Sequence, residues 1–166
     1  AQRGHKSVGF IGSNQNGPNS GLRKSGFINK CRDLGLHMDQ IWMREEADRD
    51  FSSGFHAMKE ILSLKNRPTA VFINVPEQAM GAVTACKSEQ IIFREEMELF
   101  SVGHSKSFEY FSPSISMVCT PVFEVAESAL DLLMVVIRSE GNAPIARNLK
   151  AKYVFGDTCG DFNDRL

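Results

Sequence analysis

The sequence predicts an α/β fold in which a mostly parallel sheet carries helices on both faces. Short apolar runs typical of buried strands alternate about five times with segments of helical periodicity along the 166 residues. The connections between successive apolar runs are too long for hairpins, and parallel strands require crossover connections of this kind. The pattern therefore indicates βαβ units and a sheet covered by helices.

Residues 7–43 predict two strands with a helix between them. Ser7–Gly12 is a short apolar run that ends in glycine, as in a buried strand, and the polar stretch Ser13–Ser20 after it is rich in turn-forming residues. In the helix that follows, apolar residues recur at near-helical spacing and Gly35 is placed to end the helix. These apolar residues are Leu22, Ile28, Cys31 and Leu34. Gln40–Met43 predicts the second strand.

The next segment predicts a helix, a strand and a further helix. Asp50 can cap a helix whose apolar residues are spaced by four, three and four positions. That stripe consists of Phe51, Phe55, Met58 and Leu62. Ala70–Asn74 is the clearest strand of the chain. Glu77–Cys86 has the composition of a helix of small residues, in which Gly81 allows close approach to the sheet.

The last third of the chain predicts three more strands and the most apolar helix. Glu98–Val102 and Ile115–Val118 are the fourth and fifth strands, and the apolar helix runs from Val122 to Ile137. Leu149–Phe155 predicts a final strand. The polar tail at 157–166 is expected to fray.

Composition and charge argue against several classes of protein. Nineteen Lys and Arg residues against twenty Asp and Glu residues leave a formal charge of −1, which gives no basic excess for nucleic-acid binding. No apolar run approaches the roughly 20 residues needed to cross a bilayer, and residues 1–20 lack the apolar region of a secretion signal. We therefore expect a cytoplasmic protein without membrane contacts.

The cysteines and histidines lack the spacing of a metal site. The cysteines form no CxxC, and the histidines form no HxxxH or HExxH pair. These residues are Cys31, Cys86, Cys119 and Cys159 with His5, His37, His56 and His104. We expect reduced, mostly buried cysteines, no metal site and no cofactor.

In parallel α/β sheets, ligands bind beyond the carboxyl ends of the strands. Here those ends fall at Ser13–Asn16, the loop 44–50, Asn74–Glu77 and Gly103–Ser107. A ligand site is therefore expected where these four segments meet.

Several short motifs follow one another along the chain. They are RGHKSVGFIG at residues 3–12, RKSGF at 23–27, SGFHAM at 53–58, RPTAVF at 67–72, AMGA at 79–82 and FSPSISMVCT at 111–120. Each motif alone is weak. Their order and spacing over about 150 residues resemble the effector-binding region of the lactose-repressor/galactose-repressor family of bacterial transcription regulators.

The resemblance implies a Rossmann-like lobe of the type I periplasmic-binding-protein-like fold. Residues 1–120 would form the carboxyl-side lobe of the effector-binding domain, and the long apolar helix in 121–140 would pack on an N-terminal lobe that is missing from this chain. Residues 141–156 would return as a strand and 157–166 would form a tail. The DNA-binding headpiece is also absent, so operator DNA would be a partner only through that headpiece.

The resemblance also implies ligand contacts. Arg23 matches a family arginine that hydrogen-bonds a sugar hydroxyl or a purine, a role that suits its five donors, although it could also be a solvated helix arginine. Asn19 matches a polar contact position and Asn14 could reach the same space, but turn chemistry alone explains both asparagines. Arg49 falls where the family often places an aromatic ring stacked on the ligand, or it is a solvated loop charge.

Two departures from the family pattern concern carboxylates. Val75-Pro76 stand where the family usually carries Asn, Ser or Gly followed by Asp, and His104-Ser105 stand where Tyr or Phe and then Asp usually follow glycine. A carboxylate accepts two hydrogen bonds from hydroxyls, whereas Val accepts none. The predicted ligand-binding residues are Asn14, Asn19, Arg23, Arg49, Val75 and Ser105. With His104 and Lys106 nearby, this set favours an acidic or phosphorylated effector; the alternative is a degenerate pocket that binds none.

A two-fold homodimer is the other implication of the resemblance. In the family, the matching loop and two helices line the dimer interface, and aromatic and Met side chains are enriched at interface centres. The predicted interface residues are Phe51, Phe55, Met80, Val83, Phe108, Tyr110 and Phe111.

Two other functions remain open. An α/β enzyme could use His104 beside Ser105, or Cys119 with a histidine, but the chain has no GxSxG, Walker A or GxGxxG motif, and no enzyme is expected. A solute-binding protein of the related periplasmic type would need an export signal upstream. The sequence thus predicts the effector-sensing, dimerising region of a DNA-binding transcription regulator, a repressor.

Overall fold

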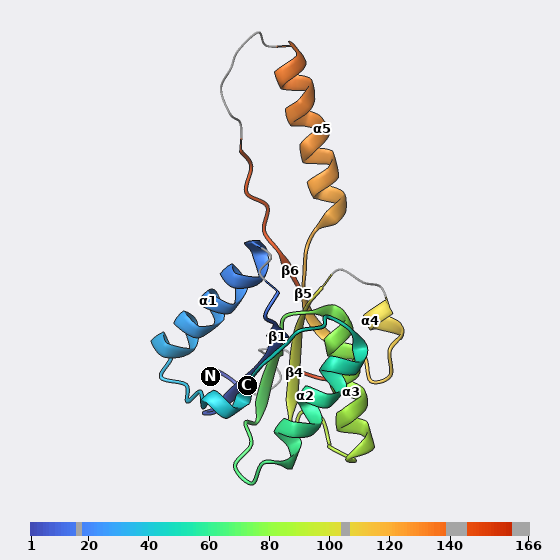
Figure 1. The fold of residues 1–166 in the computed structure, drawn as a ribbon. Coiled ribbons are helices and arrows are strands. Elements are labelled where there is room, and N and C mark those ends of the chain that lie inside the picture. Colours follow the sequence, from blue (N-terminus) through green and yellow to red (C-terminus); the bar gives the residue numbers. More distant parts are fainter. Residues whose placement is uncertain (16–17, 104–106, 139–145, 161–166) are drawn as a thin grey trace.

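The computed structural model describes residues 1–15, 18–103, 107–138 and 146–160, and within them six strands form one sheet (Figure 1). The sheet order is β2-β1-β3-β4-β5-β6, in which β6 is antiparallel to β5 and all other neighbours are parallel. The strands are β1 (Val8–Ser13), β2 (Met43–Glu46), β3 (Ala70–Ile73), β4 (Glu98–Gly103), β5 (Ser116–Cys119) and β6 (Lys152–Val154). The helices are α1 (Pro18–Asp33), the 3₁₀ turn η1 (Gln40–Trp42), α2 (Phe51–Ser63), α3 (Pro76–Ser88), α4 (Ser107–Tyr110) and α5 (Val122–Arg138).

Helices cover both faces of the sheet, as the alternating pattern predicts. Helix α1 lies on one face, and α2 and α3 pack side by side on the other (Figure 1). The main apolar core lies under α2 and α3, where Met58 and Ile61 of α2 meet Ile73 of β3 and Leu99 of β4. Burial of this apolar surface is the main driving force for folding of the lobe.

The second strand begins later than the sequence predicts. Gln40–Trp42 forms the 3₁₀ turn η1, which Asp39 caps by accepting a hydrogen bond from the Ile41 N–H at 3.1 Å. Trp42 is buried, and its Nε1 donates to the Asn66 carbonyl at 2.9 Å. The strand itself is the polar segment Met43–Glu46 at the edge of the sheet, where side chains can stay in water. An apolar run was therefore the wrong signal for an edge strand.

The tail is better ordered than the sequence predicts as far as residue 160. Thr158 is fully buried, and its hydroxyl donates to the Leu99 carbonyl and accepts from the Ser116 N–H, each at 2.9 Å. Asp157 accepts hydrogen bonds from the backbone N–H and the hydroxyl of Ser114. The expectation of fraying is wrong for residues 157–160 because these polar groups complete the end of the sheet. Residues 161–166 lie outside the described part.

Helix α5 extends away from the sheet, and the chain returns beside it to β6 (Figure 1). Arg147 lies 3.3 Å from Asp131, and Lys152 pairs with Glu124, so two ion pairs join the helix to the returning segment. None of the residues of α5 is buried, although its sequence is strongly apolar. Within the described residues, no helix has both the length and the apolar character needed to span a membrane.

Candidate functional site

The carboxyl ends of three neighbouring parallel strands, β1, β2 and β3, lie together at one edge of the sheet. The register aligns the ends of β1, β2 and β3, because Ser13 lies opposite Glu46 and Ile11 lies opposite Ile73. Backbone hydrogen bonds continue past these ends, from Asn14 N–H to the Glu46 carbonyl at 3.0 Å and from Asn74 N–H to the Ile11 carbonyl at 2.8 Å. The strands therefore hold the polar residues after them at one edge, where open α/β sheets bind ligands.

Two buried amides lie behind this edge. Asn74 is almost completely buried and donates from Nδ2 to the Ser20 hydroxyl at 3.0 Å, which joins the end of β3 to the first turn of α1. Gln78, in the first turn of α3, is fully buried, and its Nε2, which carries two N–H donors, lies within hydrogen-bond distance of three oxygens. The side-chain oxygens of both residues have no hydrogen-bond partner in the described structure. The sequence pattern did not predict a role for Gln78. The only indication in the sequence is that this polar side chain stands among small residues in the predicted helix.

A small polar cavity of about 120 Å³ lies between the first turns of α1 and the ends of β1 and β2. It is lined by Phe10, Ser13, Gln15, Ser20, Gly21, Lys24 and Glu45. Lys24 and Glu45 form an ion pair across it. The cavity is large enough for a few water molecules, and its two opposite charges already neutralise each other.

The structure does not bring all the predicted ligand residues into one pocket. Asn14 and Arg49 are exposed at the carboxyl edge, and Arg49 has no hydrogen bond or ion pair within the described part of the chain. Arg23 is half-buried one turn further along α1 and lines a different, apolar groove. The Val75 side chain is fully buried under α3, so it is not available to a ligand in this conformation. Asn19 lies in the first turn of α1, but its side chain is outside the described residues, as are Ser105, His104 and Lys106.

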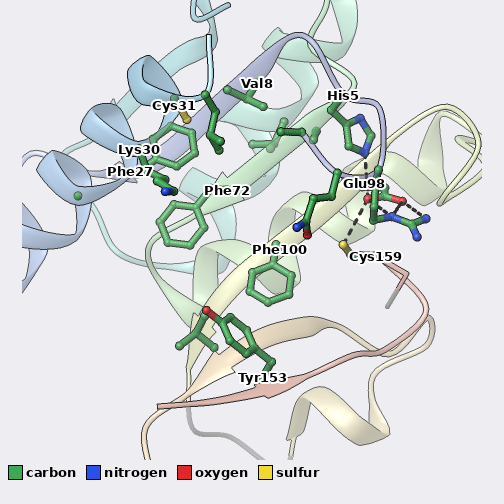
Figure 2. A pocket seen from close by; sticks show the side chains of 18 of the residues that line it. His5, Val8, Phe27, Lys30, Cys31, Phe72, Glu98, Phe100, Tyr153 and Cys159 are labelled. Carbon is green, nitrogen blue, oxygen red and sulfur yellow. Dashed lines mark hydrogen bonds and ion pairs between the residues drawn. The ribbon is translucent and has the colours of Figure 1, made fainter. Parts of the chain in front are cut away.

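The groove next to Arg23 has a volume of about 830 Å³ (Figure 2). Its floor is the face of the sheet that carries α1, and aromatic rings from three strands and α1 point into it. Phe27 and Phe72 are stacked with ring centres 5.4 Å apart, and Phe100 lies 6.4 Å from Tyr153. A floor of this kind is suited to an apolar partner surface rather than to a polar sugar.

At the amino edge of the sheet, the groove ends in a buried ionic cluster. Arg3 Nε donates to Glu98 Oε1 at 2.8 Å and Oε2 at 3.0 Å, His5 Nε2 lies 2.9 Å from Oε2, and the Cys159 thiol donates to Oε2 at 3.3 Å (Figure 2). Burial alone would raise the pKa of Glu98, but the hydrogen bonds from His5, Arg3 and Cys159, together with the electrostatic effect of His5, outweigh it and lower the pKa to about 2. Burial, together with the Glu98 charge, raises the pKa of Cys159 to about 12. The cluster joins the amino-terminal residues and Cys159 to the start of β4, so its geometry is that of a stabilising structural contact.

The predicted dimer residues divide into exposed and buried groups. Phe51 and Tyr110 are exposed, Tyr110 by 83%, and Phe55, Met80 and Phe111 are partly buried against the core. These five side chains belong to α2, α3, α4 and the residue after α4. Val83 and Phe108 lie fully inside the core of their own chain. The structure therefore places these two beneath the predicted surface, where they cannot touch a partner directly.

The described residues contain no group of three or more His, Cys, Asp or Glu side chains that could hold a metal ion. The cysteines are free thiols, of which Cys31 and Cys86 are buried and Cys119 and Cys159 are partly exposed. Burial raises the pKa of Cys86 to about 12, which makes that thiol unreactive at neutral pH.

A family described as "Periplasmic binding protein-like domain" matches residues 1–159. The HTH-type transcriptional repressor PurR of Yersinia enterocolitica is 28% identical over 155 residues, which is 92% of this chain and 45% of that protein. PurR of Erwinia tasmaniensis is 29% identical over 141 residues, 84% of this chain and 40% of the relative. The chain thus spans about half the length of these curated relatives.

Solved structures show the same fold. A regulatory protein of the LacI family from Chloroflexus aggregans superposes with a TM-score of 0.85 at 18% identity, covering 95% of this chain and 57% of that one. A sugar-binding transcriptional regulator (LacI family) from Escherichia coli, complexed with phosphate, has a TM-score of 0.81 at 18% identity over 95% and 56% of the two chains. At this identity the superpositions establish the architecture alone.

Proposed function

Because the chain belongs to the periplasmic binding protein-like domain family, we propose that it is the carboxyl-side part of the effector-binding domain of a bacterial transcriptional regulator, a repressor that acts in the cytoplasm. The named relatives are transcriptional repressors and regulators rather than enzymes. The motifs and the match to the family over residues 1–159 support this function over that of an α/β enzyme. Operator DNA is a partner through a headpiece that is not part of this sequence.

The proposed effector is a small acidic or phosphorylated molecule that binds at the carboxyl edge. One observation carries this proposal: Arg49, exposed at this edge, has no ion pair within the described part of the chain. A guanidinium without a carboxylate partner favours an anionic ligand and can bind it through two parallel hydrogen bonds. The Val75-Pro76 sequence at the end of β3 supplies no carboxylate that would repel such a ligand.

Titration calorimetry with three probes tests the effector class. We expect the chain to bind a hexose 6-phosphate and a hexonic acid more tightly than the parent hexose, and we expect affinity for the phosphate to fall as salt rises. Tighter binding of the neutral hexose than of either anion would contradict the proposal. A chain that binds none of the three would instead support a degenerate pocket.

Helix α5 is proposed to pack on a further lobe of the regulator. The helix is amphipathic, yet none of its residues is buried, and large apolar side chains such as Phe123, Leu130 and Ile137 are exposed. Soluble proteins rarely expose a continuous apolar surface of this size without a partner. The roughly twofold greater length of the relatives is consistent with such a lobe.

A homodimer is proposed to form through α2, α3 and the segment around α4. Phe51 stacks on Phe55 with ring centres 6.4 Å apart, and together with Met80, Tyr110 and Phe111 they supply partly exposed aromatic and Met surface. Sedimentation of Phe111→Asp tests this interface, because a charge at the centre of an apolar interface should yield monomers. A variant that still sediments as a dimer would remove Phe111 from the interface.

A further inference from the structure

The buried amide of Gln78 joins three segments of the carboxyl edge. Its Nε2 lies 3.2 Å from the Gly12 carbonyl at the end of β1, 3.0 Å from the Asp48 carbonyl in the loop after β2, and 3.2 Å from the Ser53 hydroxyl in the first turn of α2. Gln78 itself belongs to the first turn of α3. The two carbonyls can only accept hydrogen bonds, so they fix which end of the amide carries the nitrogen.

The helix that carries Gln78 is held at this place by backbone contact. A Cβ atom at Gly54 of α2 would lie 2.1 Å from the carbonyl oxygen of Gln78, and one at Gly81 of α3 would lie 2.0 Å from that of Phe51. Two glycines therefore let the amino-terminal halves of α2 and α3 touch. The sequence also predicts a close approach at Gly81, but to the sheet, whereas the structure places Gly81 against α2. This contact brings the amide within reach of the loop and leaves it little freedom to move.

The loop that Gln78 contacts presents Arg49 to solvent. The carbonyl of Asp48, the residue before Arg49, accepts hydrogen bonds from both Gln78 and the Ser53 hydroxyl. Asp50 caps α2 by accepting from the Ser53 N–H at 2.8 Å. From the outside, Gln15 Nε2 donates to the Ala47 carbonyl at 2.7 Å. Gln78 thus holds the loop through a buried hydrogen bond, and Gln15 holds it through an exposed one.

The amide is unusual because its oxygen is buried without a donor. An apolar side chain of similar length would fill this space without leaving an acceptor unpaired. What the amide provides, and a methionine would not, is the pair of N–H groups directed at Gly12, Asp48 and Ser53.

From this geometry we propose that Gln78 is a positioning residue that fixes the loop 47–50 and thereby aims Arg49 at the effector. The proposal rests on the proposed function for the role of Arg49 in binding, but the effect on the loop is independent of any ligand. Gln78 touches no ligand itself, since it is sealed from solvent, and it acts through the Asp48 carbonyl.

Hydrogen exchange followed by mass spectrometry tests the effect on the loop. In Gln78→Met we expect amides of residues 47–53 to exchange at least tenfold faster, while those of β3 and β4 keep their protection. The matched control is Gln15→Met, which removes the exposed hydrogen bond to the Ala47 carbonyl of the same loop and should raise exchange by a smaller factor. Equal exchange in the loop before and after Gln78→Met, or a uniform rise over the whole chain, would overturn the proposal.

A second variant covers the case in which Gln78→Met does not fold. Gln78→Asn keeps an amide but is shorter by one methylene, so its nitrogen is withdrawn from the Asp48 carbonyl. The same local rise in exchange over residues 47–53 is expected, and its absence would count against the proposal equally.

Titration with a hexose 6-phosphate separates this inference from the function on which it rests. If Gln78 acts through Arg49, Gln78→Met should weaken binding at least fivefold, and adding it to Arg49→Ala should cause no further loss. An additive loss in the double variant would overturn the link to Arg49. A parent chain that does not bind the phosphate would refute the proposed effector class, whereas the exchange data would still decide the role of Gln78 in the loop.

Discussion

The amino and carboxyl edges of the sheet differ in whether their charged side chains are buried and paired. At the amino edge, Glu98 and Arg3 are almost completely buried and paired, with His5 and Cys159 completing the hydrogen bonds. At the carboxyl edge, Arg49 is exposed without a partner in the described structure, and the buried polar groups behind it are neutral amides.

The difference separates stability from binding. A buried charge whose hydrogen bonds are all made inside the protein has nothing left to offer a ligand, whereas an exposed guanidinium adds little to stability and can still bind an anion. Substitutions at the amino edge should therefore change the free energy of unfolding, and charge removal at the carboxyl edge should change binding alone.

The largest expected effect comes from breaking the amino-edge cluster. Glu98→Ala removes the buried carboxylate that pairs with Arg3 and accepts from His5 and Cys159, so the free energy of unfolding should fall by about 3–5 kcal/mol. Urea unfolding followed by circular dichroism measures the change. Glu95→Ala removes an exposed carboxylate three residues away and should stay within about 0.5 kcal/mol of the parent. A decrease in the free energy of unfolding below about 1 kcal/mol for Glu98→Ala would show that the cluster does not stabilise the fold.

Acid should weaken the same cluster without any mutation. The pKa of Glu98 is lowered from its ordinary value of 4.5 to about 2, so its stabilisation is fully present above pH 4.5 and is lost as the pH falls from 4.5 towards 2. The linked loss is about 3 kcal/mol. Asp50 and Asp157 also have lowered pKa values and contribute in the same direction. The specific measurement is therefore the pH dependence of the difference between the parent and Glu98→Gln, which should shrink over this range; a constant difference would contradict it.

Much of this fold could be predicted because its signals are local. The apolar runs at Ala70–Asn74 and Glu98–Val102 and the capping residue Asp50 depend on neighbours in sequence, and the structure confirms them within a residue or so at each end. The edge strand β2 was misplaced because an exposed edge imposes no apolar pattern. The ordered tail was missed because the hydrogen bonds of Thr158 join residues 42 and 59 positions apart.

The candidate site was predicted less well for the same reason. The position of the site at the carboxyl edge follows from the parallel sheet. The burial of Val75 and the hydrogen bonds of Gln78, in contrast, depend on how closely α3 approaches α2. A pair of glycines can signal close approach, but nothing in their local sequence identifies the partner. The ionic cluster was likewise hidden, because Arg3 and Glu98 are 95 positions apart.

The contact between α2 and α3 offers a test of how rigid the carboxyl edge is. Gly54→Ala places a Cβ against the Gln78 carbonyl, so the two helices must separate, and stability should fall by about 1–3 kcal/mol. Gly26→Ala in α1 is the matched control, because its Cβ would meet no atom within 4 Å and should stabilise the helix by about 0.5–1 kcal/mol. Thermal unfolding of both variants measures the effects. Equal melting temperatures for the two would mean that α2 and α3 are not locked together.

The smallest effect on stability is expected for Arg49→Ala, and this variant tests the comparison most directly. The side chain is exposed and unpaired in the described structure, so the free energy of unfolding should change by less than about 0.5 kcal/mol. Binding of a hexose 6-phosphate should nevertheless weaken about tenfold, equivalent to about 1.4 kcal/mol, because a charge-assisted contact is lost. Lys65→Ala removes the same charge from an exposed loop between α2 and β3, at the opposite edge, and should change neither quantity. If both variants weakened phosphate binding equally, the net charge of the lobe, and not the placement of Arg49, would account for its attraction to anions.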